Sequence, residues 1–234
     1  VEEVNALGGV QFELKMEDDA HDAEKAVNAY NALKDWGMQL SLNSVTTTPG
    51  IATSELNAAD SIFGLTPSAS GTGVTEGKTN VFQMCFADPN QGSASAKYIS
   101  DQQLGPKIGV IYKNDDAYSS GIYETFKAEA DALGLEIVSE TTFTTDSQND
   151  FSVQLQAVKE AGADLLFLPV YAQEAAYIIT QADKAGLDVT FFGCDGLDGI
   201  LEKIGTDNLP LTEGVMLLTP FAADSNTEPT KSFT

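Results

Sequence analysis

Two loops rich in hydroxyl side chains follow apolar runs in the first half of the chain. The first loop follows Met38–Leu42 and leads into Pro49, a residue that suits the first turn of a helix. The second follows Ser61–Leu65, and its Gly71 and Gly73 leave backbone N–H groups accessible. Hydroxyls and the N–H groups of a helix N-terminus bind anions, so both loops could hold a carboxylate. Their candidate ligand-binding residues are Val45, Thr46, Thr47, Ser68, Ala69 and Ser70.

The second half of the chain places two aromatic rings and one carboxylate beside the ends of predicted strands. Tyr118 stands just before the predicted helix Ser119–Leu133, and Tyr171 stands at the exit of the apolar run Asp164–Val170. Asp195 follows another apolar run, where a carboxylate without a partner cation would be an odd choice. A simple turn aspartate is the alternative interpretation of this position.

Together the two sets of residues would suit a zwitterionic ligand. Its carboxylate would bind Thr47, Ser70 and nearby backbone N–H groups, each charge-assisted contact contributing about 1.5–3 kcal/mol before desolvation. Its ammonium would pair with Asp195 and lie against Tyr118 or Tyr171 through a cation–π attraction of about 0.5–2 kcal/mol. A site of this kind between two lobes predicts hinge closure on the ligand.

The charge balance restricts the possible partners. The 234 residues include 35 acidic side chains against 12 basic ones, all of them lysines, and the formal net charge is −23. This surface would repel a phosphate backbone or an anionic membrane, so no nucleic-acid partner is expected. No apolar run approaches the roughly 20 residues of a membrane span, and no membrane insertion of this segment is expected. Without arginine, a bound carboxylate must be held by hydroxyls, backbone N–H groups, helix N-termini or lysine.

The sequence contains no strong motif for a metal, nucleotide or catalytic site. Cys85 and Cys194 have no zinc spacing and His21 is the only histidine, so neither a metal nor a cofactor is expected. The segment Gly71–Gly73 lacks the third glycine and the long helix of a dinucleotide fingerprint. A hydrolase using Ser70 or Cys194 would lack a neighbouring base, and Cys194 is interpreted as small apolar filler.

Two acidic clusters are interpreted as solvated. Glu17–Asp19 precedes the predicted helix Asp22–Trp36, where acids complement the positive end of the helix dipole. Asp115 and Asp116 follow the apolar run Ile108–Tyr112 and could form a metal or acid pair. Solvation is preferred for them, because neighbouring acids in a turn usually face water.

The elements that must position these residues repeat along the chain. Six times a helical stretch closes on a glycine and an apolar run follows, which indicates a parallel sheet covered by helices. Such sheets gather ligands at the carboxyl ends of their strands. Thr48 is expected to cap a helix that runs to about Ala59. The six glycines are Gly8, Gly37, Gly105, Gly134, Gly162 and Gly186, and the runs are Val10–Leu14, Met38–Leu42, Ile108–Tyr112, Leu135–Val138, Asp164–Val170 and Leu187–Phe192.

The predicted fold is an α/β protein of two doubly wound parallel-sheet lobes joined by a hinge. The best internal boundary is the turn-forming cluster Ala87–Gly92, before a predicted helix at Ser93–Leu104. Lobe one is expected to comprise residues 1–88, lobe two residues 89–221, and residues 222–234 a return towards lobe one.

Six short segments match the sequence pattern of one protein family. In chain order they are Val1–Gly9, Glu17–Asp19, Leu65–Ser70, Phe86–Gly92, Asp150–Ser152 and Gly193–Gly196. As an ordered set they are specific, and the resemblance covers nearly the whole chain. The chain resembles the leucine/isoleucine/valine-binding group of amino-acid receptors of ABC importers, which have the type I periplasmic binding protein fold.

This resemblance implies a role for each candidate residue. The hydroxyl of Thr47 and the hydroxyl and N–H of Ser70 would bind the ligand carboxylate, and the carbonyl of Ser68 would bind its ammonium. The two tyrosines of the second half would close over the ligand, and Asp195 would take the ammonium. The strand ends and the family pattern therefore select the same positions.

The chain also departs from the family pattern. Family members often have Gly-Pro where this chain has Asn43-Ser44. They also begin with a further strand and loop and end with additional helices, so the chain resembles a member truncated at both ends. A leader would then be absent from this piece.

The expected function is capture of an α-amino acid, branched-chain or aliphatic, between the two lobes and its delivery to a membrane ABC permease, with no bond made or broken. The expected location is extracytoplasmic, in the periplasm or as a cell-surface lipoprotein. The alternative is a sensory ligand-binding domain of the same fold, within a receptor or regulator.

Overall fold

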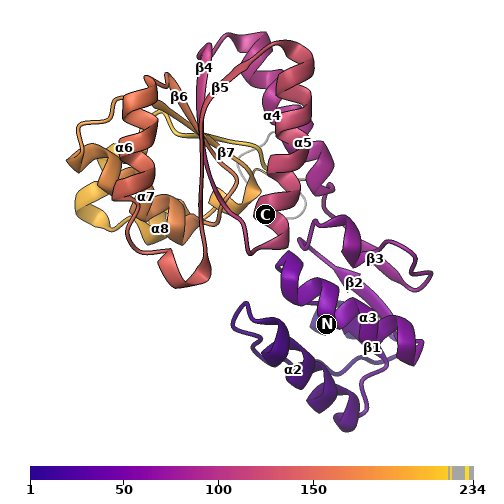
Figure 1. Cartoon of the computed structure of the whole chain (residues 1–234). Coiled ribbons are helices and arrows are strands. Elements are labelled where there is room, and N and C mark those ends of the chain that lie inside the picture. Colours follow the sequence, from indigo (N-terminus) through magenta and orange to yellow (C-terminus); the bar gives the residue numbers. More distant parts are fainter. Residues whose placement is uncertain (221, 223–229, 232–234) are drawn as a thin grey trace. The chain divides into compact units, whose positions relative to one another are not determined.

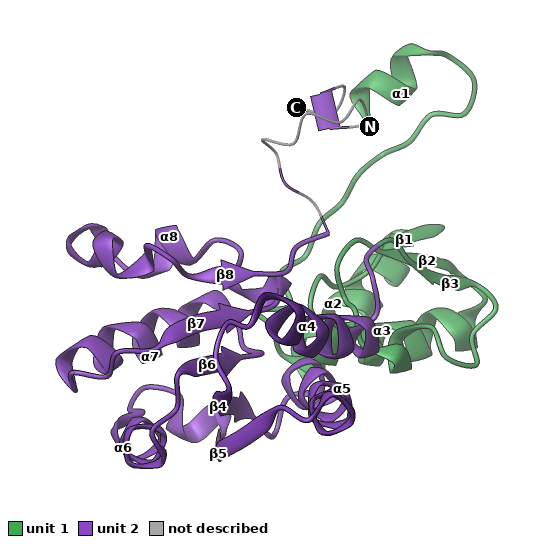
Figure 2. Ribbon diagram, turned by 90° about the horizontal axis from the view of Figure 1, so that it is seen from above, with its two compact units in different colours: residues 1–84 green, residues 85–234 purple. Residues whose placement is uncertain are grey.

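Two separate parallel sheets organise the chain. The computed structural model describes residues 1–220, 222, 230 and 231, and the chain divides into unit 1, Val1–Met84, and unit 2, Cys85–Thr234 (Figure 2). The sheet of unit 1 has the order β1-β2-β3, formed by β1 (Leu40–Leu42), β2 (Phe63–Thr66) and β3 (Val81–Gln83). The sheet of unit 2 has the order β5-β4-β6-β7-β8, formed by β4 (Lys107–Lys113), β5 (Glu136–Phe143), β6 (Leu165–Leu168), β7 (Thr190–Gly193) and β8 (Met216–Leu217).

Helices accompany the strands in both units. In unit 1, α1 (Glu2–Ala6) and α2 (Ala23–Trp36) precede β1, and α3 (Thr47–Asp60) connects β1 to β2. The helices of unit 2 are α4 (Asp88–Gln102), α5 (Ala117–Leu133), α6 (Ser152–Ala161), α7 (Ala172–Lys184) and α8 (Ile200–Lys203). All strand pairs in both sheets are parallel, which confirms the predicted α/β class.

The sheet of unit 2 is buried on both faces. Figure 1 shows α4 and α5 on one side of this sheet and α6 and α7 on the other. Along β6, Leu165 and Phe167 join the core under α4 and α5, whereas Leu166 and Leu168 join the core under α6 and α7. Phe167 stacks on Phe126 of α5 with ring centroids 3.9 Å apart. A continuous apolar strand is typical of a parallel sheet with two covered faces.

The strand order of this sheet changes direction at β4. From β4 it first crosses to β5 at one edge, and then returns past β4 to β6, β7 and β8. The carboxyl ends of β4 and β6 therefore border the point where the two directions of winding separate. In open α/β sheets, ligands bind outside the strand ends at such a point.

Five of the six predicted helix–glycine–strand joints lead into a strand. Gly134 is a typical case, since it ends α5 in the left-handed conformation and β5 begins two residues later. At the joint after α4 the left-handed residue is Gln103, with φ of +53°, and not Gly105. Gly105 instead permits close packing, because a Cβ there would lie 3.1 Å from the Cβ of Asp164.

The predicted strand Val10–Leu14, extended to Met16, is wrong. Residues 11–19 form no helix or strand, and Val10, Leu14 and Met16 are 73%, 55% and 79% exposed. No strand of the described residues pairs with this segment. Alternating apolar residues stabilise a strand only where a neighbouring strand and a covering layer receive them.

Several element boundaries also differ from the predictions. Helix α4 begins at Asp88 and carries Pro89 in its first turn, so the turn-forming cluster before Ser93 is largely the start of a helix. Strand β8 was not predicted. The predicted lobe limits at residues 88 and 221 stay predictions, and the predicted return at 222–234 lies largely outside the described residues. Among the described residues, no helix combines the length and apolarity needed to cross a membrane.

Candidate functional site

The first hydroxyl-rich loop forms the N-terminus of α3. Thr46 is the residue before the helix, with extended backbone, and Thr47 is the first helical residue. The prediction that Thr48 caps this helix is therefore wrong by two positions. Pro49 is tolerated in the first turn because the N–H groups there have no partner within the helix. The hydroxyl of Thr46 lies 2.6 Å from Nδ1 of His21.

The second hydroxyl-rich loop is joined to the first by two hydroxyl groups. The N–H of Gly71 donates to Oγ1 of Thr47 at 3.1 Å. Thr66, at the end of β2, accepts from the N–H of Ala69 at 3.0 Å and donates to the carbonyl of Ser44 at 2.9 Å. Thr66 was not predicted as a site residue, although its place at a strand end was a usable signal.

The six predicted site residues of unit 1 differ in how far they are buried. Thr47 and Ser70 are each 1% exposed, and Oγ of Ser70 has no hydrogen-bond partner among the described residues. The side chain of Ala69 is buried in a small core with Val74, so only its backbone is available for polar contacts. The predicted positions Val45, Thr46 and Ser68 are at least partly exposed. Unit 1 thus brings neutral hydroxyl and N–H donors together at a helix N-terminus.

In unit 2 the structure brings together Tyr118, Tyr171 and Asp195. The hydroxyl of Tyr118 donates to Oδ1 of Asp195 at 2.7 Å and accepts from the N–H of Gly196 at 2.8 Å. The rings of Tyr118 and Tyr171 stack with centroids 4.8 Å apart and an interplanar angle of 20°. Gly196 is required there, because a Cβ would lie 2.7 Å from the Tyr118 hydroxyl and from the carbonyl of Val170.

Each of these residues comes from the carboxyl end of a strand. Tyr118 follows β4, Tyr171 follows β6, and Asp195 opens the short 3-10 turn Asp195–Leu197 after β7. Tyr118 lies inside the first turn of α5, and not before that helix as predicted. The helix starts early because Asp116 caps it by accepting from the N–H of Ser119 at 3.0 Å.

Burial sets the protonation behaviour of this group. Desolvation raises the pKa of Asp195, and hydrogen bonds from Tyr118, Gln91 and the N–H of Gly196 oppose that shift. Burial also raises the pKa of the Tyr118 phenol far above its ordinary value, so the phenol keeps its proton and donates it. The cluster therefore presents a partly buried carboxylate, already oriented by neutral donors, that a cation would stabilise.

The acidic clusters and the cysteines are explained by local structure. Asp116 is only 4% exposed, so the prediction that it is solvated is wrong: the side chain satisfies a helix N–H group. Asp115 is exposed and accepts from the N–H of Thr145 at 2.9 Å. Cys194 is fully buried in the core of unit 2, and burial raises the pKa of its thiol, as suits apolar filler. The described residues contain no group of three His, Cys, Asp or Glu side chains that could hold a metal ion.

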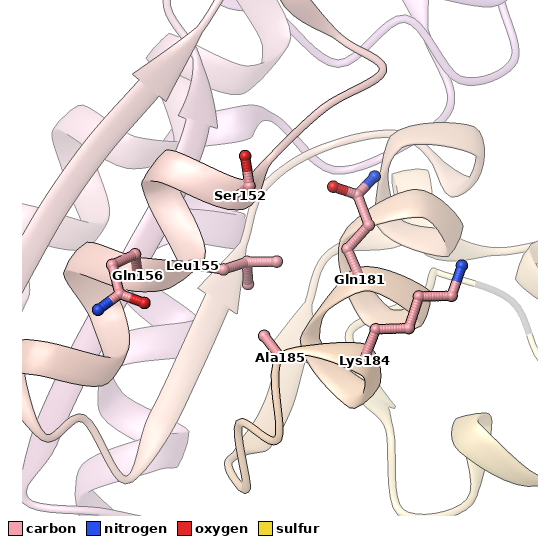
Figure 3. A pocket seen from close by; sticks show the side chains of 6 residues that line it. All are labelled: Ser152, Leu155, Gln156, Gln181, Lys184 and Ala185. Carbon is pink, nitrogen blue, oxygen red and sulfur yellow. The ribbon is translucent and has the colours of Figure 1, made fainter.

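A groove on the surface of unit 2 lies away from the predicted residues. It has a volume of about 320 Å³ and is formed by side chains of α6 and α7 (Figure 3). Gln181 of this groove is already engaged, because it accepts from the N–H of Phe151 and donates to the carbonyl of Asn149. The remaining lining residues are Ser152, Leu155, Gln156, Lys184 and Ala185. None of the predicted site residues lines it.

Comparison with known proteins gives consistent matches over most of the chain. The family model of the periplasmic binding proteins matches residues 1–234. The Leu/Ile/Val-binding protein homolog 3 of Brucella melitensis is 30% identical over 201 residues, which are 84% of this chain and 54% of that protein. The Leu/Ile/Val-binding protein BraC3 of Rhizobium johnstonii is 29% identical over 213 residues, covering 88% of this chain and 57% of that protein. The chain thus spans a little over half the length of these curated relatives.

Solved structures agree with the sequence matches. The leucine binding protein LivK of Thermotoga maritima has a TM-score of 0.87 and 25% identity, covering 94% of this chain and 63% of that one. The substrate binding protein LivJ of Streptococcus pneumoniae, solved in complex with isoleucine, has a TM-score of 0.79 and 25% identity, covering 87% of this chain and 59% of that one. With its two parallel sheets, its strand-end clusters and the match over its whole length, the chain belongs to the periplasmic binding protein family.

Proposed function

We propose that this protein is an extracytoplasmic solute-binding protein that captures an α-amino acid for an ABC importer. The observation that carries the proposal is the Tyr118–Asp195 pair at the carboxyl ends of β4 and β7. A carboxylate that is partly buried and oriented by the neutral donors Tyr118, Gln91 and Gly196 is suited to receive an ammonium group.

The aromatic rings beside Asp195 support a cationic guest. Tyr118 and Tyr171 stack on each other next to this carboxylate. Aromatic faces attract an ammonium group by about 0.5–2 kcal/mol, more when water is excluded. This attraction adds to the ion pair with Asp195 and does not require a further charged residue.

Unit 1 supports the recognition of a carboxylate. Thr47 stands in the first turn of α3 and its hydroxyl already accepts from Gly71, so its own proton is free to be directed at an anion. Helix N-termini bind anions through their N–H groups and the helix dipole. Ser70, with its buried hydroxyl, lies in the adjoining loop. An α-amino acid carries both groups, and we propose it as the ligand class.

The relatives support the substrate class and the place of action. Those named above are Leu/Ile/Val-binding, leucine binding or branched-chain amino acid transport proteins, so we propose an aliphatic amino acid as the ligand. We propose a membrane permease as the partner that receives it, and an extracytoplasmic location. No bond is made or broken in this function.

Calorimetry with the complete protein tests the proposal. Titration against the twenty amino acids is expected to show binding of one or more aliphatic members. Asp195→Asn keeps the shape of the side chain but removes its charge, and it is expected to weaken binding by more than about tenfold. Asp198→Asn, an exposed substitution three residues along, serves as the matched control and is expected to leave affinity unchanged. Binding of none of the twenty, or full affinity in Asp195→Asn, would contradict the proposal.

A further inference from the structure

Helix α4 carries a polar stripe where an apolar one would be expected. Asp88, Gln91 and Ser95 are 2%, 1% and 0% exposed, and their spacing of three and four residues places them on one side of the helix. Buried polar side chains are costly unless they are hydrogen-bonded. The stripe continues into Ile99, an ordinary core residue, so the polarity is confined to the N-terminal half of α4.

This stripe contacts the loop that carries Asp195. Oε1 of Gln91 accepts from the N–H of Asp195 at 3.2 Å, and Nε2 of Gln91 donates to Oδ1 of Asp88 at 3.4 Å. One turn further, Oγ of Ser95 lies 3.7 Å from Sγ of Cys194. The two residues that begin the loop after β7 are therefore both held by α4, more than 90 positions earlier in the chain.

Helix α4 is itself fixed against the helix that carries Tyr118. A Cβ at Gly92 would lie 2.1 Å from Oγ1 of Thr125 and 2.3 Å from the carbonyl oxygen of Ile122, both on α5. Helices that approach this closely have little freedom to slide. Helices α4 and α5 lie side by side (Figure 1). Gln91 on α4 and Tyr118 on α5 thus contact Asp195 from two tightly packed helices.

We propose that Gln91 is a positioning residue, which fixes the backbone of Asp195 so that its carboxylate meets the ligand ammonium in one orientation. This inference rests on the proposed function, since it assumes that Asp195 binds an ammonium group. Gln91 itself touches Asp195 and not the ligand.

The chemistry of glutamine suits this role. Its amide offers an acceptor and a donor at once, and here it uses the acceptor on Asp195 and the donor on Asp88. A glutamate would lack the donor and would bring a third carboxylate beside two others. A methionine has a similar length and apolar volume, but it can make neither bond.

Gln91 also acts on the charge of Asp195. Burial raises the pKa of Asp195, and the nearby side chain of Gln91 is one of the influences that lower it, in addition to its bond with the Asp195 N–H. Tyr118 on α5, Cys194 on the same loop and Cys85 before α4 lie near this carboxyl: burial raises their pKa values, and the charge of Asp195 raises them further. Asp88, which contacts Gln91, also raises the pKa values of the two cysteines. Removing Gln91 is therefore expected to raise the pKa of Asp195 further, so that ligand affinity is lost at a higher pH on acidification.

The experiment compares Gln91→Met with the matched control Gln102→Met, an exposed position at the end of the same helix. Leucine binding to the complete protein is measured by calorimetry at several pH values, and the pKa of Asp195 is measured without ligand by carbon-13 NMR of its carboxyl. Gln91→Met is expected to bind about tenfold more weakly. Its affinity is also expected to fall off at higher pH than in the wild type, with a matching rise in the pKa of Asp195. Gln102→Met is expected to behave as the wild type in both measurements.

The outcomes separate this inference from the proposed function. Weaker binding in Gln91→Met with an unchanged pH profile and an unchanged Asp195 pKa would overturn the positioning role, and so would unchanged binding. If the wild type binds no amino acid, the proposed function fails, and the NMR measurement alone decides whether Gln91 controls Asp195. If Gln91→Met does not fold, Gln91→Asn is used in its place. This variant keeps the amide on a side chain one methylene shorter, and it is expected to change the ligand affinity and the pKa of Asp195 in the same directions but by less. Wild-type values in Gln91→Asn would then overturn the inference.

Discussion

The two sheets of this protein are buried in opposite ways. In unit 2 both faces are covered, and β6 is apolar and buried along its whole length. In unit 1 the buried face is largely polar: Ser41 and Thr66 are 6% and 0% exposed, and a Cβ on Gly64 would lie 3.1 Å from the side chain of Asn57 on α3. Val81 of β3 is the apolar exception on this face, at 2% exposed. The other face of that sheet carries apolar side chains that are 41–74% exposed, namely Leu40, Leu42, Phe63, Phe82 and Met84.

This contrast indicates which interactions stabilise each unit. Unit 2 is stabilised mainly by two apolar cores, whose burial is non-directional. The buried face of unit 1 depends on hydrogen bonds such as those of Thr66, whose loss leaves groups unsatisfied. Its apolar face gains little from folding as long as it remains in water. Three experiments test this difference between the two units.

The largest change in the free energy of unfolding is expected from a large-to-small substitution in the core of unit 2. Phe167→Ala removes a fully buried ring that stacks on Phe126, and it is expected to lower the free energy of unfolding by about 3–5 kcal/mol. Leu42→Ala on the exposed face of unit 1 is expected to change it by less than about 0.5 kcal/mol. Denaturant unfolding followed by circular dichroism measures both. A cost of Leu42→Ala comparable to that of Phe167→Ala would mean that the apolar face of unit 1 is covered in solution.

A smaller effect is expected from a buried hydroxyl. Thr66→Val removes the bonds to Ser44 and Ala69 while keeping the shape, and it is expected to cost about 1–3 kcal/mol of stability. The matched change in unit 2 is Thr141→Val, which removes one bond to the carbonyl of Val110 at a partly exposed position. It is expected to cost less than about 0.5 kcal/mol. Equal costs in the same unfolding measurement would remove the contrast between the units.

The smallest effect concerns two aspartates with opposite pKa shifts. The hydrogen bond with Lys34 lowers the pKa of Asp60 in unit 1 below its ordinary value of 3.8, whereas burial raises that of Asp195 in unit 2 above it. Asp60 therefore contributes stability above pH 3.8 that is lost as the pH falls through its folded value. Asp195 has the reverse sign, because acidification through its raised pKa relieves the cost of burying its charge. Carbon-13 NMR of the two carboxyls is expected to show Asp195 titrating first as the pH is lowered; the opposite order would contradict both assignments.

The parts of the fold that the sequence predicted are those where local pattern and tertiary burial agree. Within the predicted run Asp164–Val170, which follows Gly162, the continuous apolar residues Leu165–Leu168 form β6. Residues Val10–Leu14 alternate apolar and polar side chains but form no strand, because pairing depends on a partner that a local pattern does not reveal. The first turn of α5 was misplaced because Asp116 was interpreted as solvated, although an aspartate three residues before Ser119 is a capping signal.

The candidate site was predicted in its strand-end residues but not in its supports. Tyr118, Tyr171 and Asp195 lie within a few residues of the carboxyl ends of β4, β6 and β7, so the parallel sheet places them at one edge. Gln91 was missed because its role exists only through a contact with a residue 104 positions away. Within a helix sequence, a buried glutamine looks like any solvent-facing one.

The lack of arginine has a consequence for the behaviour of the site in salt. The hydroxyls and N–H groups around Thr47 are neutral donors, and the Asp195 carboxylate is oriented by a phenol and amides. A net-neutral amino acid approaching a protein of formal charge −23 feels little long-range force, and short contacts with dipoles are screened weakly by ions. Under the proposed function, the affinity for such a ligand is therefore expected to stay nearly constant from dilute buffer to high ionic strength.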